Sequence, residues 1–472
     1  MMNYYYDAFS PLWLLLLVFV VLPSPNNITT TTVVSAWGKD GHELIGNLAF
    51  KLLSNETQTI VCQILVDHPI MSNTNAVNNN NKNNNINTPL GAVADWADQV
   101  RIHHEWHWSG VLHYIDIHDN VVTGGCPVYN ETSDQLAQCR FEYQRDCSKN
   151  ACVAGAIVNY TNHLAEWNQQ QQQQQRHHQH HQQYHTTQKH DALSNHHHHL
   201  RGSLALTAPW WFTLFGNGMT IWDSKSNNNI DTVTTPTVNQ QQEQLPMMPS
   251  TLIQESLMFL THFVGDIHQP LHSARTTDRG GNSIAVTFDK KIVLNSTATT
   301  TTTTTSSSSS HHHTSHALEL HAVWDSSMII RAIQSKYNGS RALLEDELLE
   351  YIIHTTTQQH QHQQPQHQGG ELYLCTHDWL KCTDTSQYDH CTSVWAQESF
   401  ENAMTWAYAN VDNVSEVVSG THLTDEYYET RWIQIKHYLA LAGARLAASL
   451  EQTLGPSSAA SALSALATTS TS

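Results

Sequence analysis

Positive charge is scarce in this sequence. Its 472 residues include 22 Lys and Arg against 41 Asp and Glu, which gives a formal net charge of −19 when the 34 His are counted as neutral. Because binding to a phosphate backbone depends on Lys and Arg, an acidic protein is a poor general binder of nucleic acid. Any recognition of phosphate must therefore come from local charge, and bound metal ions would supply it.

Three other features are missing or weak. No two cysteines are spaced as Cys-x-x-Cys, which disfavours a cysteine zinc site. No repeat of solenoid type is present. The apolar run at residues 12–22 is too short to span a bilayer comfortably, but it fits the core of a secretory signal.

Residues 1–36 are predicted to be a signal peptide. The tripeptide Val34-Ser35-Ala36 offers small residues at the two positions that a signal peptidase reads. The alternative is an uncleaved membrane anchor, because the leading stretch carries Asp7 and no Lys or Arg. Cleavage after Ala36 would free the backbone amine of Trp37, five residues before His42. A free amine, its adjacent carbonyl and an imidazole can together hold one zinc ion.

Cysteines and sequons agree with a secreted protein. The eight Cys fit an oxidising compartment, and disulfides are favoured for the clusters at Cys126, Cys139, Cys147 and Cys152 and at Cys375, Cys382 and Cys391, with Cys62 apart. Asn-x-Ser/Thr sequons that would carry N-linked glycans begin at Asn55, Asn130, Asn159, Asn295, Asn338 and Asn413.

Low-complexity tracts interrupt the chain. Asn, Gln, His, Thr and Ser crowd residues 73–87, 168–200, 224–249, 296–316 and 355–370. These tracts lack the apolar content that would offset their ordering entropy, so we expect mobile loops or disordered insertions, and a disordered tail at 455–472. Without the tracts and the signal, roughly 300 residues remain, which is in the upper range for one compact domain.

Segment 256–272 is the strongest chemical signal. Leu257, Leu260 and Val264 recur at spacings of three and four, which predicts an amphipathic helix. Pro270 should end or kink this helix and let the following His leave its register.

Two His/Asp pairs indicate metal ligands. His262 and Asp266 are four residues apart, so they share one face of the predicted helix. A single such pair would be more simply interpreted as a buried His bonded to a carboxylate, but the spacing recurs at His321 and Asp325 on another expected helix. Nitrogen and oxygen ligands of this kind suit zinc, and manganese or iron on ligand type alone.

Taken together, the motifs resemble the S1/P1 family of secreted zinc-dependent nucleases, and its plant and protist branch in particular. The matching segments are Trp-Gly-x-x-Gly-His at 37–42, Trp-Ala-Asp-x-x-Arg at 96–101, Leu-His-Tyr-x-Asp at 112–116, His-x-x-x-Asp-x-His-Gln-Pro-Leu-His at 262–272, Asp-x-Gly-Gly-Asn at 278–282, His-x-x-x-Asp at 321–325, Trp-Ala-x-Glu-Ser at 395–399 and Ala-Gly-x-Arg-Leu-Ala at 442–447. Each segment alone is modest evidence, but their order is specific. The expected domain covers 37–454, with the tracts as insertions.

The resemblance implies a mainly α-helical fold, a single compact domain of the phospholipase C/P1 nuclease type, with three zinc ions in a cleft. The implied ligands of the first zinc are Asp98, His113, His262 and one oxygen of Asp266. Those of the second are the other oxygen of Asp266, His42, and the amine and carbonyl of Trp37. Those of the third are His272, His321 and Asp325.

The implied activity is hydrolysis of phosphodiester bonds in single-stranded DNA and RNA to 5′-phosphorylated products, together with 3′-nucleotidase activity. Asp116 would orient or deprotonate the nucleophile, and Arg101 would hold Asp116 or neutralise phosphoryl oxygens. A purely structural Arg101–Asp116 salt bridge is equally consistent. Tyr114 is expected either to stack on a base or to pack in the core, and Asn282 to contact the base.

Two other classes compete with this interpretation. A zinc-dependent phospholipase C shares the fold and the N-terminal Trp ligand, but those lipases carry Glu at the position of Asp325, and Gly-Gly-Asn282 favours nucleotides. A non-catalytic zinc-binding glycoprotein would explain the His tracts, but not two His/Asp pairs and Trp37. We expect a monomer without stable membrane association once the signal is removed, in the extracellular space, the vacuole or the lysosome.

Overall fold

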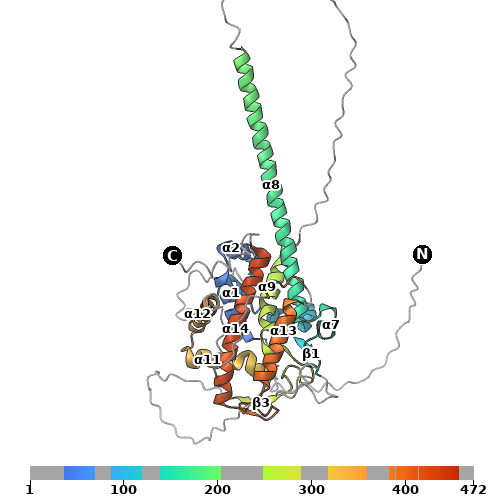
Figure 1. Cartoon of the computed structure of the whole chain (residues 1–472), viewed down its shortest axis with the longest axis vertical. Helices are drawn as coiled ribbons and strands as arrows, with labels where there is room; N and C mark the ends of the chain where they lie inside the picture. Colours follow the sequence, from blue (N-terminus) through green and yellow to red (C-terminus); the bar gives the residue numbers. More distant parts are fainter. Residues whose placement is uncertain are drawn as a thin grey trace, which may run out of the picture. The chain divides into compact units, whose positions relative to one another are not determined.

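Helices dominate the described part of the chain (Figure 1). The computed structural model describes residues 37–69, 87–119, 139–203, 248–288, 317–358, 382–387, 390–412 and 414–455, and at 181–203 and 356–358 it describes the backbone alone. The prediction of a mainly α-helical fold is confirmed. Among the described helices, none combines the length and the apolar character that crossing a bilayer requires.

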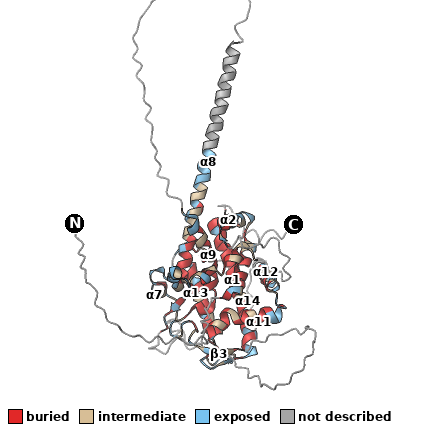
Figure 2. Ribbon diagram, turned by 180° about the vertical axis from the view of Figure 1, so that it is seen from behind, coloured by how far each residue is buried: buried red, intermediate tan, exposed pale blue. Residues whose placement is uncertain are grey.

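Three helices form the centre of the fold: α1 (Gly38–Leu52), α9 (Ser250–Ile267) and α14 (Asp425–Leu454). They contact one another, and α8 (Val153–Ser203) packs against α9 and α14. Helix α13 (Cys391–Asn402) packs against α9, and its Glu398 pairs with Arg445 of α14. Their buried residues meet in the interior, as Figure 2 shows. The helices around them include α2 (Asn55–Leu65), α4 (Pro89–Val93), α5 (Trp96–Val100), α7 (Tyr143–Asp146), α11 (Met328–Lys336) and α12 (Arg341–Gln358).

Helix α9 is the predicted amphipathic helix, but it is buried on nearly every face. Leu257, Leu260 and Val264 have no exposed surface, as their spacing predicted. The polar His262 and Asp266 are equally inaccessible, because α1, α5, α8 and α14 surround the helix. The helix ends at Ile267, and a 3₁₀ turn, η6 (Pro270–His272), follows it, which confirms the effect expected of the proline.

Short strands join the segments that follow two predicted ligands. Strand β1 (Ile115–Ile117) pairs in parallel with β2 (Ser273–Arg275), with Ile115 opposite Ser273. Strand β3 (Ala285–Phe288) lies between β4 (Leu318–Glu319), antiparallel to it, and β5 (His422–Leu423), parallel to it. Because β1 follows His113 and β2 follows His272, the β1–β2 pairing brings these two histidines to the same region.

The Gln/His tract at 168–200 differs from its prediction. It continues helix α8 without a break, so it is not a loop in this structure. Gln is a good helix former, and the tract extends a segment, Val153–Trp167, that packing already holds in a helix. Figure 2 shows α8 passing from buried to exposed residues along its length. Helix α12 likewise runs into the 355–370 tract as far as Gln358.

The other tracts lie almost entirely outside the described residues, as do the signal peptide and all of the tail but Gly455.

The predicted disulfides are present where the structure describes them. Cys147 is bonded to Cys152 and Cys382 to Cys391, and Cys139 is also in a disulfide. Cys62 is an exposed free thiol. Three sequon asparagines, Asn55, Asn159 and Asn338, are exposed, as glycosylation requires.

Candidate metal centre

Three histidines converge on the carboxylate of Asp266. Oδ1 of Asp266 lies 3.3 Å from Nε2 of His42, which is on α1. Oδ2 lies 3.0 Å from Nδ1 of His113, the last residue of the 3₁₀ helix η2 (His104–His113). Oδ2 is also 3.3 Å from Nε2 of His262, one turn earlier on α9. The i,i+4 spacing thus places both side chains at one site, and residues distant in sequence complete it.

Asp98, on α5, completes this first group. Its Oδ1 lies 3.5 Å from Nδ1 of His113 and 3.7 Å from Nε2 of His262. The imidazole of His42 stacks on that of His262, with ring centroids 3.8 Å apart. Gly265 permits this approach, because a Cβ there would lie 2.8 Å from Nδ1 of His42.

His272, His321 and Asp325 form a second group. Nε2 of His321 lies 3.1 Å from Nε2 of His272 and 3.3 Å from Oδ2 of Asp325. Nδ1 of His272 is 3.9 Å from Oδ1 of Asp266, so the two groups adjoin. The expected helix is present but irregular: α10 (Leu320–Ala322) gives way to a π-helical turn, η7 (Val323–Ser327), which carries Asp325. Such turns are frequent at functional sites.

Trp37 lies beside this second group. It is the N-cap of α1 and is fully buried. Its neighbour Gly38 has φ +54°, and a Cβ there would lie 3.2 Å from the carbonyl oxygen of Asp325 and closer still to the Ser326 hydroxyl. The start of the expected mature chain is therefore packed against the segment that bears Asp325.

Unpaired buried atoms indicate what the two groups would hold. Both ring nitrogens of His42, Oδ1 of Asp266 and Oδ2 of Asp325 are buried without a hydrogen-bond partner. A buried polar atom without a partner is energetically costly, and a cation bound in each group would satisfy the carboxylate oxygens and one nitrogen of His42. The His/Asp donor set suits zinc, so the residues fit the predicted metal.

Backbone carbonyls fix the outer nitrogens of three histidines. The Nδ1 atoms donate to the carbonyl oxygens of Ala94 (from His262, 2.7 Å), His113 (from His272, 2.6 Å) and Gly280 (from His321, 2.6 Å). This arrangement leaves each Nε2 free to face the carboxylates, as in protein metal sites generally.

Burial and charge set the protonation of the first group. Burial lowers the pKa of His113 to about 4, so this imidazole is neutral. Burial also disfavours the charged form of His262, but the carboxylates of Asp266 and Asp98 outweigh it and raise the pKa of His262 to about 9. Despite its burial, Asp266 has a pKa well below its usual range because His262 and the other histidines stabilise its charge. A metal ion must displace the proton on His262, which favours binding at higher pH.

Three residues shape the site through contacts that the sequence did not predict. Gln269 is fully buried; its Nε2 donates to Oδ1 of Asp325 and its Oε1 accepts from the backbone N–H of Leu271. Gly280 supplies the carbonyl that orients His321. Arg279 is exposed and has φ +56°. Their positions within the His-Gln-Pro-Leu-His and Asp-x-Gly-Gly-Asn strings were the available signal, but nothing in those strings specifies the contacts.

The predicted catalytic residues, Arg101 and Asp116, each interact with a further charged residue. Nε of Arg101 lies 3.0 Å from Oδ1 of Asp98. Asp116 is an exposed residue of β1, but neighbouring atoms partly shield its carboxyl from water, which raises the pKa of that group. The charge of Arg279 acts in the opposite direction and lowers this pKa. Arg101 is therefore an ion-pair partner of a predicted ligand, and Arg279 is a cation that acts on Asp116.

The two predicted base-contacting residues differ in exposure. Tyr114 is 38% exposed, which argues against the core-packing alternative. Asn282 is partly buried, and its Nδ2 donates to the carbonyl oxygen of Arg279 at 2.7 Å, within the Gly-Gly-Asn turn.

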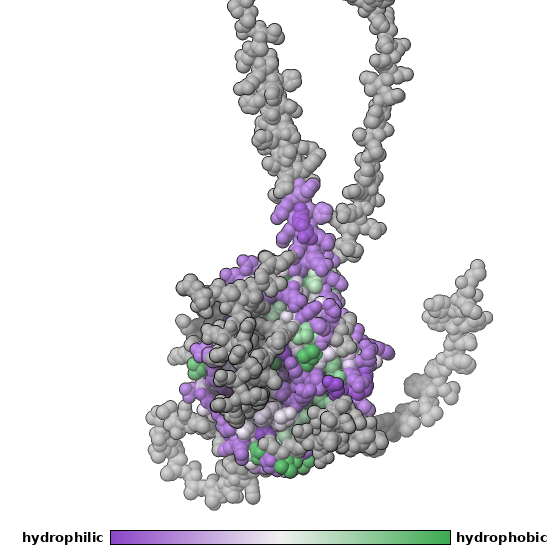
Figure 3. Space-filling view, in the orientation of Figure 1, coloured by the Kyte–Doolittle hydropathy of each residue, from purple (hydrophilic) through white to green (hydrophobic). Residues whose placement is uncertain are grey.

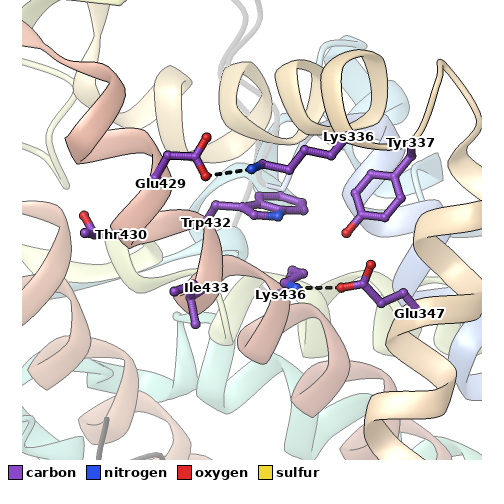
Figure 4. Close-up of a pocket in the computed structure, with 8 residues that line it drawn as sticks. All are labelled: Lys336, Tyr337, Glu347, Glu429, Thr430, Trp432, Ile433 and Lys436. Atoms are coloured by element: carbon purple, nitrogen blue, oxygen red, sulfur yellow. Dashed lines mark hydrogen bonds and ion pairs between the residues drawn. The ribbon is translucent and has the colours of Figure 1, made fainter. Parts of the chain in front are cut away.

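A surface cavity lies elsewhere, between α11, α12 and α14. It has a volume of about 520 Å³ (Figure 4). Its lysines are already paired, Lys336 with Glu429 and Lys436 with Glu347, each at 2.6 Å. With those charges neutralised and no histidine in its lining, this cavity offers neither free cations nor a metal site.

Comparisons with known proteins agree with the geometry. A model described as S1/P1 Nuclease matches residues 37–189 and 202–455. Endonuclease 2 of Arabidopsis thaliana is 25% identical over 447 residues, covering 94% of this chain and 96% of that protein. Endonuclease 1 of the same plant is 24% identical over 425 residues (89% and 88%). Nuclease S1 of Aspergillus oryzae is 23% identical over 417 residues (88% and 91%).

Proposed function

This chain belongs to the S1/P1 nuclease family, and we propose that it is a zinc-dependent endonuclease acting on single-stranded DNA and RNA. Its products carry 5′-phosphates, and it also removes phosphate from 3′-nucleotides. The observation that carries this proposal is the pair of adjoining buried His/Asp groups, joined through Asp266 and His272.

Three zinc ions divide these ligands. Asp98, His113, His262 and Asp266 hold one; Asp266, His42 and the backbone amine and carbonyl of Trp37 hold a second; and His272, His321 and Asp325 hold the third. Zinc bound there supplies Lewis-acid chemistry and lowers the pKa of water. The nine protein residues contribute imidazoles, carboxylates and the backbone of Trp37, and the buried His and Asp side chains already lie together in groups.

Residues at the rim handle the substrate. Arg101, which is partly exposed, neutralises phosphoryl oxygens while its pair with Asp98 fixes its position. Asp116 takes the proton of the attacking water, a role that its raised pKa suits. Tyr114 stacks on a base, and Asn282 contacts the base edge.

The active form begins at Trp37. Removal of residues 1–36 in the secretory pathway creates the amine ligand, and glycans attach to exposed sequons. The protein then acts as a monomer outside the cell or in a vacuole or lysosome.

The test uses purified, processed protein with single-stranded DNA, RNA and phosphatidylcholine, before and after chelation and zinc return. Zinc-restored cleavage of nucleic acid to 5′-phosphate products, with lipid untouched, is the expected result. Activity on lipid alone would identify a phospholipase. No activity in protein whose first residue is Trp37 by mass spectrometry would indicate a zinc-binding relative without catalysis.

A further inference from the structure

A row of exposed side chains follows the segment that leads into the metal centre. Ile102, Glu105, Trp108, Val111 and Tyr114 are spaced by three residues, and all five are exposed. A 3₁₀ helix has about three residues per turn, so side chains at this spacing lie above one another. Glu105, Trp108 and Val111 lie within helix η2 and are aligned in this way. Ile102 precedes His103, the N-cap with extended backbone, and Tyr114 is the C-cap with extended backbone, so these two residues flank the helix. We call these five residues the η2 row.

The η2 row is unusually apolar for an exposed surface. Trp108 is 53% exposed, Ile102 54% and Val111 47%. On the face shown in Figure 3, by contrast, most of the coloured residues are hydrophilic and hydrophobic ones form small, separate patches. A Cβ on Gly110 would have no atom within 4 Å, so the space beside the helix is open.

Packing holds the Trp108 ring in place from one side. Its centroid lies 5.8 Å from that of Trp106 and 6.0 Å from that of Phe259, which is on α9. Half of the side chain remains accessible, so a rigid aromatic surface faces solvent.

Both ends of the η2 row adjoin the first metal group. Ile102 follows Arg101, the ion-pair partner of Asp98, and Tyr114 follows His113. With a rise of about 2.0 Å per residue, Trp108 lies about 10 Å along the helix from His113. Stacked nucleotides are spaced by about 3.4 Å, so this distance corresponds to about three nucleotides.

We propose that the η2 row is a stacking surface for the bases of a single-stranded nucleic acid that extends from the scissile bond. This inference rests on the proposed nuclease function and adds a binding surface to it. Every base has a face that stacks on an aromatic ring, so such a surface tolerates any sequence. Paired bases in a duplex are stacked on one another and cannot use it, so the η2 row favours single strands. In a chain with a net charge of −19, stacking replaces much of the attraction that Lys and Arg provide elsewhere.

The chemistry of the η2 row favours this partner over a lipid surface. Glu105 lies within the row, and none of its five residues is Lys or Arg. Peripheral helices that bind membranes usually combine a larger apolar face with basic residues.

The experiment measures kcat/KM for oligonucleotides of two to eight nucleotides and for a 3′-nucleotide, with the processed, zinc-loaded protein. In the wild type, kcat/KM should rise with length over the first few nucleotides. Trp108→Ala and Trp108→Leu should each lower the ratio of long-oligonucleotide to 3′-nucleotide kcat/KM by about ten- to a hundredfold, since stacking contributes that much per base. Trp108→Phe should retain part of the rise. The control is Ile433→Ala, a 45% exposed apolar residue on α14, which should match the wild type.

The outcomes separate the two proposals. If the wild type cleaves oligonucleotides and Trp108→Leu, folded by its melting temperature, keeps the wild-type length dependence, the η2 row is not the stacking surface. If that length dependence persists while binding to phosphatidylcholine/phosphatidylserine vesicles is lost, the row binds membranes and the proposal is overturned. If the wild type cleaves no nucleic acid, the proposed function itself fails.

Discussion

His321 and Gly280 are joined by a bond from the imidazole Nδ1 to the backbone carbonyl, 2.6 Å long. Gly280 has φ +62°, and a Cβ there would lie 2.3 Å from the carbonyl oxygen of Leu271, the neighbour of His272. One glycine therefore maintains the spacing between two ligands of the same group, and it does so through its backbone.

Replacement of this glycine should disrupt the second metal group. Gly280→Ala must move Leu271 or the turn, so we expect lower thermal stability and loss of about one zinc per chain. Gly339→Ala is the matched control, because Gly339 has φ +76° but nothing within 4 Å of a Cβ. The control should lose only the backbone term, about 1–2 kcal/mol. Equal melting temperatures and equal zinc contents for the two variants would contradict the role of Gly280.

Asp266 and Asp325 should differ in how many ions they retain. Asp266 contacts the predicted ligands His42, His113 and His262, whereas the predicted ligands that Asp325 contacts, His272 and His321, both belong to the second group. We expect Asp266→Asn to lose about two zinc ions and Asp325→Asn about one, measured by elemental analysis after equilibration with limiting zinc. Loss of the same number from both variants would refute the assignment of Asp266 as a shared ligand.

The N-terminal ligand can be tested without a substitution. A chain that retains Ala36 has an amide in place of the free amine at Trp37, so it should bind one zinc fewer and lose most of its activity. Mass spectrometry of the intact protein establishes the first residue, and zinc content and nuclease rate are then compared with the processed form. Full activity in the extended form would rule out the backbone of Trp37 as a ligand.

The stability of the fold should fall in acid, in part through His437. Burial, aided by the charge of Arg445, lowers the pKa of His437 from 6.5 to about 4. Between these two pH values the unfolded chain binds more protons than the folded one. The contribution of neutral His437 to the free energy of unfolding is therefore complete above pH 6.5, and it declines by up to about 3 kcal/mol as the pH falls to 4.

Urea unfolding across this pH range tests the sign. His437→Phe should flatten the dependence relative to the wild type, and His422→Phe, at an exposed position, should leave it unchanged. A steeper slope in His437→Phe would show that the histidine is not neutral in the fold.

Local chemistry made much of this protein predictable from sequence. The i,i+4 spacing of His262 and Asp266 fixes their common helical face whatever surrounds them, and Pro270 ends the helix because it lacks an N–H. The order of the motifs identified the family. The prediction of a loop at 168–200 was wrong because the helix that precedes the tract continues into it, which the composition of the tract alone does not indicate.

Only the tertiary structure shows which residues that lie far apart in the sequence contact one another. The contact between His113 and Asp266 joins residues 153 positions apart, and no periodicity in the sequence specifies which carboxylate oxygen faces which imidazole. The hydrogen bond from Gln269 to Asp325 is likewise not specified by any spacing in the sequence. The bond from His321 to the carbonyl of Gly280 could not be predicted either, because a backbone acceptor requires no particular residue type. The sequence determined which side chains could bind metal. The packing of α1, α5, η2 and α9 determined that the ligands of the first group share one site, because only the folded chain brings those four elements together.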